Sequence, residues 1–332
     1  MANSFNAPYA DRINRLKEKV LTTYPEIDLE NARILTQSFH ETEGEVFVLR
    51  KAKAFRRQCQ EKTVEIWDDE LIVGNAGSKI RGGILSADVC WSVLDKELDT
   101  INTRPYDKFH LRPEDRKIFE EEIRPYWKGR SNYEAWLAQI PEDVAALRDN
   151  GALYIDKKAV RGWGEVTAGY EWFIKNGVNG IVKLVEAQKA GLDATRPGDY
   201  EKEAYLDSLL VVAEGMLTLA ERYALEADRL ASAEKDPARR RELRKIAEIC
   251  RHVPAQPACT FHEALQSFYF YQIFLFMEQN AAAYNPGRMD QYLYPYYKAD
   301  HDAGRITPEE AQELLDCLWV KFSEQCLFQD GK

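Results

Sequence analysis

The chain has 332 residues, a formal net charge of -10 and a pI near 5.3, and this length allows one large domain or two smaller ones with a sizeable core. A hydrophobic fraction of 45% and a charged fraction of 30% exclude disordered and fibrous classes of protein. The acidic balance argues against a general polyanion-binding surface, so no nucleic-acid partner is expected.

The six cysteines are scattered and form no C-x-x-C pair, and a chain of this size does not need a disulfide framework. The N-terminus carries no apolar segment of the kind found in secretory signals. The most apolar stretch, 268–277, is about half as long as the roughly 20 residues that cross a bilayer. These features predict a reduced, cytoplasmic protein without a membrane segment, in which 268–277 is a buried helix.

Helical periodicity dominates the first half of the chain. Asp28 is placed to cap a helix that runs through 29–44, and a second, basic amphipathic helix is predicted at 45–62. A short β-prone run at 67–75 predicts a strand that leads into a glycine-containing loop. Proline and acidic residues at 113–115 predict a helix that begins there and ends near Pro125.

The second half is predicted to be almost entirely helical. Thr307 and Glu310 have the spacing of a capping box at the start of the last helix. No internal repeat, low-complexity tract or linker-like change in composition divides the chain. The predicted helices span 166–190, 200–232 (the longest), 237–252, 261–283 and the residues after 307, with a tyrosine-rich segment after Pro286.

Common catalytic motifs are missing from the sequence. Without H-E-x-x-H, G-x-S-x-G, a P-loop or G-x-G-x-x-G, it lacks the usual signatures of zincins, α/β-hydrolases, P-loop enzymes and simple dinucleotide-binding enzymes. The spacing of the histidines favours surface or hydrogen-bonded helix residues, so no metal is predicted, although the fold could bring some of them together. The five histidines stand at positions 40, 110, 252, 262 and 301.

Six segments stand out together by their order and separation. They are EGEVFVLRKAKAF at 43–55, DDELIVGNAGSK at 68–79, KELDTINTRPYDKF at 96–109, EEIRPYWKGR at 121–130, NPGRMDQYLYPYY at 285–297 and ELLDCLWVKF at 313–322. Together they resemble the N-terminal part of the pyruvate formate-lyase-like glycyl radical enzymes, in the branch of dehydratases, amine lyases, sulfite-lyases and arylacetate decarboxylases. The resemblance extends from about Arg12 to Phe322.

This resemblance implies a mainly α-helical chain with a few strands, the N-terminal portion of a ten-stranded α/β barrel surrounded by helices. In such enzymes a radical SAM iron–sulfur activating enzyme installs a glycyl radical, which oxidises a cysteine to the thiyl radical that takes hydrogen from substrate. The chemistry needs a dry, closed site with a base or carboxylate beside the leaving group. The implied partners are a small-molecule substrate, the activating enzyme and, as relatives are commonly dimers, a second copy.

The sequence departs from the family in two loops. Relatives carry a Gly-Cys-x-Glu loop near the middle and an Arg-Val-x-Gly-Tyr loop near the C-terminus, and neither occurs here. The tripeptide at 59–61 matches Cys-x-Glu but lacks the preceding glycine, and the Ala-Gly-Tyr at 168–170 lacks the preceding Arg-Val. Both are interpreted as ordinary helix residues, so no catalytic residue is predicted in this chain.

We therefore expect residues 1–332 to be the N-terminal portion of the barrel domain, truncated or split. The cysteine loop and the glycyl radical domain would come from a missing C-terminal half or a partner chain. Alone, the chain would bind substrate without turning it over, because the radical centre is missing. The alternative is a non-catalytic helical scaffold or binding protein derived from the same fold. Part of a barrel should expose a broad apolar edge, and an adapted scaffold should not.

The first segment that bears on the substrate lies before the helix predicted from Val166. Relatives carry a Gly-His or Gly-Asp pair there, and Glu165 stands at the corresponding position. Glu165 is expected to receive an ammonium or hydroxyl group, and the alternative is an acid favoured by the helix dipole. Trp163 is expected to line the pocket beside an apolar or cationic group, or to be part of the core.

The second segment follows the apolar helix. Diol dehydratases tend to carry a His-Ser pair where Ala282 and Ala283 stand, so glycerol and propanediol are disfavoured and a bulkier substrate, an arylacetate or a cyclic amino acid, is favoured. Asn280, Ala282, Ala283 and Arg288 are predicted to line the substrate site, although an ion pair with Asp290 is the favoured role of Arg288. The resulting prediction is a lyase, dehydratase or decarboxylase of anaerobic metabolism that acts on a small polar or aromatic metabolite.

Overall fold

A computed structural model describes residues 9–153, 165–193, 195–279 and 283–328. This part of the chain is mainly α-helical with four short strands, as the sequence predicts. The helices are α1 (Ala10–Thr22), α2 (Glu30–Glu41), α3 (Phe47–Glu61), α4 (Ala87–Cys90), α5 (Ser92–Asp95), α6 (Pro113–Ile118), α7 (Arg124–Trp127), α8 (Asn132–Leu137), α9 (Glu142–Asp149), α11 (Tyr170–Ala190), α12 (Asp199–Ala233), α13 (Pro237–His252), α14 (Phe261–Glu278), α15 (Met289–Asp302) and α16 (Pro308–Glu324). The strands are β1 (Glu26–Asp28), β2 (Gly82–Ile84), β3 (Glu165–Thr167) and β4 (Ala283–Asn285).

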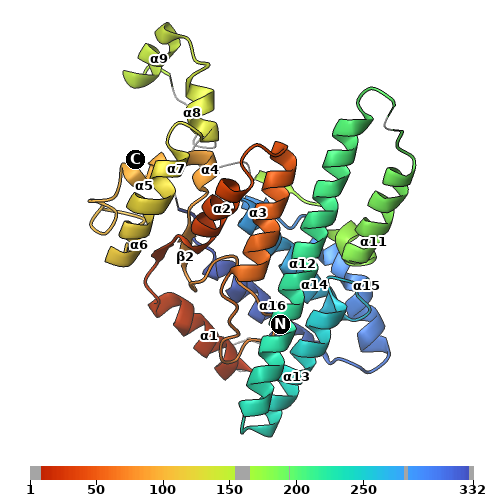
Figure 1. The fold of residues 1–332 in the computed structure, drawn as a ribbon. Coiled ribbons are helices and arrows are strands. Elements are labelled where there is room, and N and C mark those ends of the chain that lie inside the picture. Colours follow the sequence, from red (N-terminus) through yellow and green to blue (C-terminus); the bar gives the residue numbers. More distant parts are fainter. Residues whose placement is uncertain (1–8, 154–164, 194, 280–282, 329–332) are drawn as a thin grey trace.

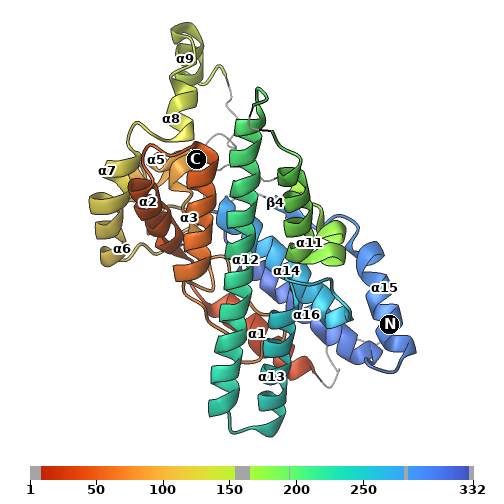
Figure 2. The same ribbon diagram turned by 45° about the vertical axis from the view of Figure 1, so that its right-hand side comes forward.

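The longest helix, α12, runs along the whole molecule (Figure 1). α11 lies beside its first half, α13 beside its second half, and α3 packs against it between them (Figure 2). Close approach to α3 depends on Gly215, where a Cβ atom would come 2.9 Å from the Cα atom of Arg56. The buried side of α12 is rich in alanine, which lets its neighbours pack at short distance.

Buried apolar side chains form two clusters. The larger cluster is centred on α14, whose aromatic residues 268–270 and Phe274 are almost fully buried, and it joins α11, α12, α13 and α16. The smaller cluster lies between α2 and residues 85–127, with Trp91, Phe119 and Trp127 at its centre. α8 and α9 project away from both clusters (Figure 1).

The described strands form two parallel pairs. β1 pairs with β2, and single parallel bridges from Glu26 to His110 and from Gly83 to Cys326 extend this ladder on both sides. β3 pairs with β4, although 115 residues separate Thr167 from Ala283 in the sequence. Parallel pairing of distant segments through long helical connections is the arrangement of an α/β barrel.

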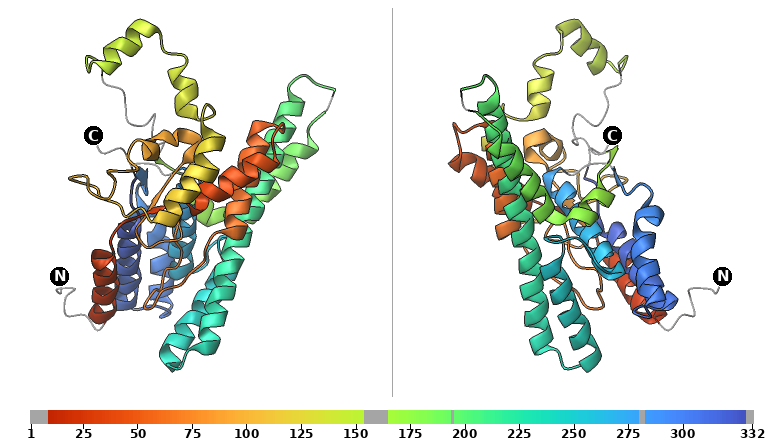
Figure 3. Two further views of the ribbon diagram at one scale, coloured as in Figure 1. Left: turned by 60° about the vertical axis from the view of Figure 1, so that its left-hand side comes forward. Right: turned by 90° about the vertical axis from the view of Figure 1, so that its right-hand side faces the viewer.

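The helix α1 was not predicted, and it lies against α16 (Figure 3). Arg12 of α1 binds the carboxylates of Glu242 on α13 and of Glu313 on α16, the latter at 2.8 Å. These contacts join the start of the described chain to its last helix.

Most predicted helices are confirmed. The range 237–252 is correct at both ends, α12 is the longest helix, and Thr307 and Glu310 form the expected capping box. Residues 268–277 form a buried part of α14, as predicted, and none of the helices in the described ranges is long and apolar enough to cross a membrane.

Several predicted boundaries are wrong. Asp28 lies in β1 and Leu29 is the N-cap residue of α2, but Asp28 Oδ1 still accepts a hydrogen bond from Glu30 N, the first amide of α2, at 3.1 Å. Its other oxygen, Oδ2, accepts hydrogen bonds from the backbone of Ser78 and Lys79. The helix predicted from Val166 begins at Tyr170, and the residues before it form β3. The helix predicted to reach Ala283 ends at Glu278. The helix predicted to end near Pro125 does end close to it, at Trp127, after a π-helical turn at Phe119–Ile123.

The strand predicted at 67–75 is also absent from the described residues. Ile72 and Val73 are fully buried and belong to no strand, and side chains take the place of a partner strand. The amide of Gln266 on α14 accepts a hydrogen bond from Val73 N at 2.9 Å and donates one to Val73 O at 2.9 Å. The apolar character of this run therefore reflects burial between helices, and not a place in a sheet.

A buried ion cluster fixes the same segment to α16. Lys321 Nζ lies 2.6 Å from the carboxylates of both Glu70 and Glu324, and these three side chains are at most 4% exposed. Burial by itself would lower the pKa of Lys321, but Glu324 and Glu70 outweigh it and hold that pKa well above its usual value. Lys321 therefore stays charged inside the core.

Replacing this buried ammonium should destabilise the chain strongly. Lys321→Met leaves two carboxylates buried without a counter-charge, and we expect a loss of about 3–5 kcal/mol in the free energy of unfolding, measured by urea denaturation. Lys298→Met is the control, because Lys298 and its partner Asp302 are both more than half exposed and their ion pair contributes little. Equal midpoints for the two variants would contradict a structural role of the cluster.

Candidate functional site

The pairing of β3 with β4 brings the two predicted substrate segments together. Glu165 is the register partner of Ala283, and Thr167 is the partner of Asn285. Ala283 is exposed at the start of β4. The predicted residues Trp163, Asn280 and Ala282, and the side chain of Glu165, lie outside the part of the chain that is described.

Arg288 stands just beyond this strand pair. Its guanidinium binds the carboxylate of Asp290 with N–O distances of 3.1 and 3.0 Å, and its side chain is 76% exposed. The ion pair favoured from the sequence is therefore present. The Arg288 side chain pulls the pKa of Asp290 far below its usual value through this hydrogen bond.

A buried amide on α14 holds β4 in place. Gln272 Nε2 donates to the backbone carbonyl of Tyr284 at 3.2 Å, and Gln272 Oε1 accepts from the hydroxyl of Tyr170. Burial raises the pKa of Tyr170 well above its usual value, so its hydroxyl remains a donor. One glutamine thus joins the first residue of α11 to the middle of β4, immediately behind the strand pair.

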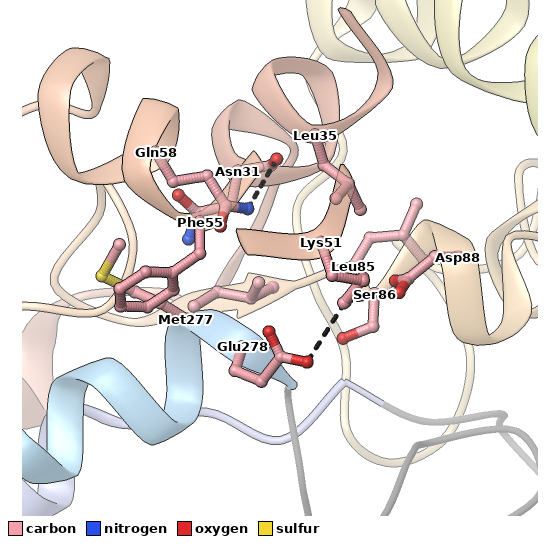
Figure 4. A pocket seen from close by; sticks show the side chains of 11 residues that line it. Asn31, Leu35, Lys51, Phe55, Gln58, Leu85, Ser86, Asp88, Met277 and Glu278 are labelled. Carbon is pink, nitrogen blue, oxygen red and sulfur yellow. Dashed lines mark hydrogen bonds and ion pairs between the residues drawn. The ribbon is translucent and has the colours of Figure 1, made fainter. Parts of the chain in front are cut away.

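Lys51 fixes the end of α14, the helix that precedes β4 in the chain (Figure 4). Lys51 Nζ on α3 lies 2.8 Å from Asp88 Oδ2 on α4 and 3.2 Å from Glu278 Oε1 at the end of α14. Burial opposes the charge on Lys51, but Asp88 and Glu278 outweigh it and raise the pKa of Lys51 above its usual value. The ammonium therefore connects the two hydrophobic clusters, which meet at this point.

The cavity beside Lys51 is too small for a metabolite. It measures about 10 Å³, which is room for about one water molecule. The cavity is lined by Asn31, Leu35, Lys51, Phe55, Gln58, Ile84, Leu85, Ser86, Asp88, Met277 and Glu278. The ion pairs of Lys51 instead fix the end of α14.

Lys51 and Gln272 make buried contacts around the strand pair that the sequence did not predict. In the sequence, Lys51 is one of several basic residues in a helix whose other face is apolar. Gln272 interrupts the apolar run 268–277, and this interruption was the available signal. A polar amide inside such a run indicates a buried hydrogen-bonding partner.

The two motif matches rejected from the sequence are structural residues. Cys59 is fully buried on α3 against α12, and burial raises the pKa of its thiol far above the usual value, so it is unreactive. Gly169 precedes the first turn of α11, and the neighbouring Tyr170 is the buried partner of Gln272. Among the described residues, a group with metal-ligand geometry does occur near the opposite end of α14, at His252, Cys259 and Glu263.

Gln272→Leu should loosen β4 selectively. The variant leaves the Tyr170 hydroxyl and the Tyr284 carbonyl without their partner, which we expect to cost about 1–3 kcal/mol in the free energy of unfolding. Backbone hydrogen exchange should become faster at 283–285 while α13 keeps its protection. Gln291→Leu, at an exposed position on α15, is the control. Unchanged exchange in β4 would show that Gln272 does not hold this strand.

Lys51→Met should free the end of α14. Asp88, whose side chain is 9% exposed, would lose its counter-charge, and we expect a loss of roughly 1–3 kcal/mol in the free energy of unfolding together with faster hydrogen exchange at 276–279. Lys53→Met is the matched control, since Lys53 lies on the same helix and pairs at the surface with Glu45. A similar effect of both variants would contradict a specific role of Lys51.

Solved structures share this arrangement over almost the whole chain. A structure of 1,2-propanediol dehydration in Roseburia inulinivorans superposes with a TM-score of 0.94 at 34% identity, covering 99% of this chain and 41% of that one. Hydroxyproline dehydratase from Clostridioides difficile, with trans-4-hydroxy-L-proline bound, superposes with a TM-score of 0.91 at 32% identity, covering 96% of this chain and 40% of that one.

Sequence comparison agrees with the structural match. An isethionate sulfite-lyase of Desulfovibrio desulfuricans is 38% identical over 322 residues, which cover 94% of this chain and 39% of the relative. The chain thus spans about 40% of the length of the curated relatives that it matches. The family model described as pyruvate formate lyase-like matches residues 6–331. The resemblance to glycyl radical enzymes of the dehydratase and lyase branch is confirmed, and the chain belongs to the pyruvate formate lyase-like family.

Proposed function

We propose that this chain is the N-terminal, substrate-facing part of a glycyl radical lyase or dehydratase that acts on a small polar metabolite. The observation that carries the proposal is the parallel pairing of β3 with β4, which places Glu165 opposite Ala283. The two segments predicted to contact the substrate are more than a hundred residues apart in the sequence. Their residues Glu165 and Ala283 nevertheless lie in adjacent strands. Together they would form one wall of the substrate site.

The position of Glu165 favours a role at the substrate over the alternative of a helix-terminal acid. Glu165 lies in β3, and α11 begins only at Tyr170. The stabilising effect of a helix dipole on an acid is confined to the first turn, so Glu165 is too far from α11 to gain from it. We propose that its carboxylate receives a hydroxyl or ammonium group, or a proton, beside the leaving group.

Exposed apolar side chains at β3 and at the helices α1 and α16 favour the hypothesis that the chain is part of a barrel over the hypothesis of a free-standing scaffold. Sheets of parallel strands in complete domains are covered on both faces, yet Val166 in β3 is 49% exposed. A groove of about 330 Å³ between α1 and α16 also leaves Leu21 69% and Trp319 55% exposed. We propose that the complementary part of the barrel, in the same polypeptide or a partner chain, covers these surfaces and supplies the radical cysteine and glycine.

The substrate is proposed to be small and polar, and cleaved at a bond between carbon and a heteroatom. The names of the relatives describe sulfite-lyases and dehydratases, which act on isethionate, hydroxyproline and propanediol. Ala283 offers a methyl group and no hydrogen-bond donor, which supports a substrate bulkier than a simple diol. A radical SAM iron–sulfur activating enzyme and a second copy of the chain are the proposed protein partners.

The proposal is tested on the native assembly. The chain is tagged in its own cells, purified without oxygen, and its partners and intact mass are determined. After incubation with the activating enzyme, S-adenosylmethionine and a reductant, electron paramagnetic resonance should show a glycyl radical. Turnover is then measured with isethionate, trans-4-hydroxyproline and 1,2-propanediol. A chain recovered alone at 38.3 kDa, with no radical and no turnover, would favour the scaffold instead.

Glu165→Gln should reduce kcat of the activated assembly by a factor of about 10²–10⁴, the usual contribution of a positioned acid or base, while the glycyl radical signal stays unchanged. Glu171→Gln is the control, because Glu171 is exposed on α11 and pairs with Lys175 at the surface. If kcat survives in Glu165→Gln, the role assigned to this carboxylate is wrong, whereas loss of the radical signal would indicate misassembly.

A further inference from the structure

Three potential metal ligands converge near the junction of α13 and α14, far along α14 from β4. They are His252 at the end of α13, Cys259 in the connecting loop and Glu263 in the first turn of α14. One ligand atom from each lies within 4.8 Å of the others. The sequence spacing gave no metal motif, because the three residues meet only when the loop folds back on itself.

The distances fit a tetrahedral site for a divalent ion. His252 Nε2 lies 3.8 Å from Cys259 Sγ and 3.9 Å from the Glu263 carboxylate. With usual zinc–ligand bond lengths, ligand atoms in a tetrahedral site are about 3.4–3.6 Å apart, so the two distances from His252 Nε2 must shorten by only a few tenths of an ångström. Cys259 Sγ and the Glu263 carboxylate lie within 4.8 Å of each other and must also approach. The carbonyl oxygen of Pro257 lies 3.0 Å from His252 Nε2 and 3.7 Å from Cys259 Sγ, beside the same point.

Backbone hydrogen bonds hold the ligand-bearing loop in this conformation. The carbonyls of Pro254 and Ala255 accept from Val178 N and Asn179 N at 2.8 and 3.0 Å, and Ala258 N donates to Ile174 O at 3.0 Å. The close approach requires the kink of α11 at Gly177, where a Cβ atom would lie 2.7 Å from Ala255 O. The loop is therefore fixed on both sides of Pro257 before any ion binds, which lowers the entropic cost of binding.

Glu263 is oriented by the backbone as well. Its Oε2 accepts hydrogen bonds from Cys259 N at 2.8 Å and Thr260 N at 3.1 Å, as part of the capping box of α14. Backbone donors of this kind fix the direction of a ligating carboxylate. The side chain of Glu263 is 12% exposed and that of His252 36%, so the group is accessible to an ion from solvent on one side.

We propose that His252, Cys259 and Glu263 bind one zinc ion, with the Pro257 carbonyl or a water molecule as the fourth ligand. A set of one imidazole, one thiolate and one carboxylate suits zinc better than magnesium or calcium, which prefer oxygen ligands alone. The ion would connect α13, α14 and, through the loop, the kink of α11. This site is independent of the proposed radical chemistry.

The proposal is tested on the 332-residue chain, freed of metal and kept reduced. Zinc is titrated in competition with a chromophoric chelator, and cobalt(II) serves as the spectroscopic probe. We expect one zinc per chain, a cobalt spectrum with tetrahedral and thiolate bands, and binding at least about tenfold weaker in Cys259→Ser and His252→Gln. Cys326→Ser and His301→Gln, at positions outside the group, are the controls and should bind zinc normally.

A second measurement keeps the proposal testable if a variant misfolds. In the native assembly, alkylation of Cys259 by iodoacetamide is followed with and without added zinc, and zinc should slow it at least about tenfold. Equal alkylation rates would overturn the proposal and leave an exposed, reactive thiol beside His252. Zinc binding that Cys259→Ser leaves unchanged, or a cobalt spectrum without thiolate bands, would overturn it as well.

Discussion

The described structure depends on how the buried residues 70–77 satisfy their backbone polar groups inside the core without a partner strand. A buried backbone group left without a hydrogen bond is costly, so each must find a partner. Gln266 binds both polar groups of Val73, and the hydroxyl of Tyr223 accepts from Asn75 N at 3.1 Å. Lys321 also pairs with the side-chain carboxylate of Glu70 in this segment. Four helices thus contribute side chains to this one segment, α12 with Tyr223, α13 with Arg239, α14 with Gln266 and α16 with Lys321.

The helix α14 connects this buried segment to the pair of strands β3 and β4. Gln266 faces the extended segment and Gln272, less than two turns further on, faces Tyr170 and the backbone of β4. Because both amides are buried on one rigid helix, the position of β4 is tied to the same packing that holds residues 70–77. The strand pair therefore rests on a fixed support.

The sequence predicted the helices well where periodicity and caps agree, and less well where tertiary contacts decide. Residues 237–252 have a proline at the start and an amphipathic pattern, and both ends were correct. The run 67–75 reads as a strand because it is apolar and β-prone, and nothing in it reveals that Gln266 replaces the partner strand. The short strands β3 and β4 lie at the edges of predicted helices, and three residues are too few to show a period. Glu165 and Ala283 were chosen by resemblance to relatives, whereas their adjacency needed the fold.

The ion clusters around Lys321 and Lys51 differ in how far they are buried. Each combines one lysine with two carboxylates, but the cluster around Lys321 is at most 4% exposed, while Glu278 beside Lys51 remains 44% exposed. Burying a charge costs more free energy than leaving it at the protein surface. The buried cluster connects Glu70 to Lys321 and Glu324 of α16. The open cluster lies where the two hydrophobic clusters meet and where the chain leaves α14 for β4. The carboxylate of Glu278 near the strand pair is thus partly exposed, whereas the ion cluster around Lys321 is enclosed in the core.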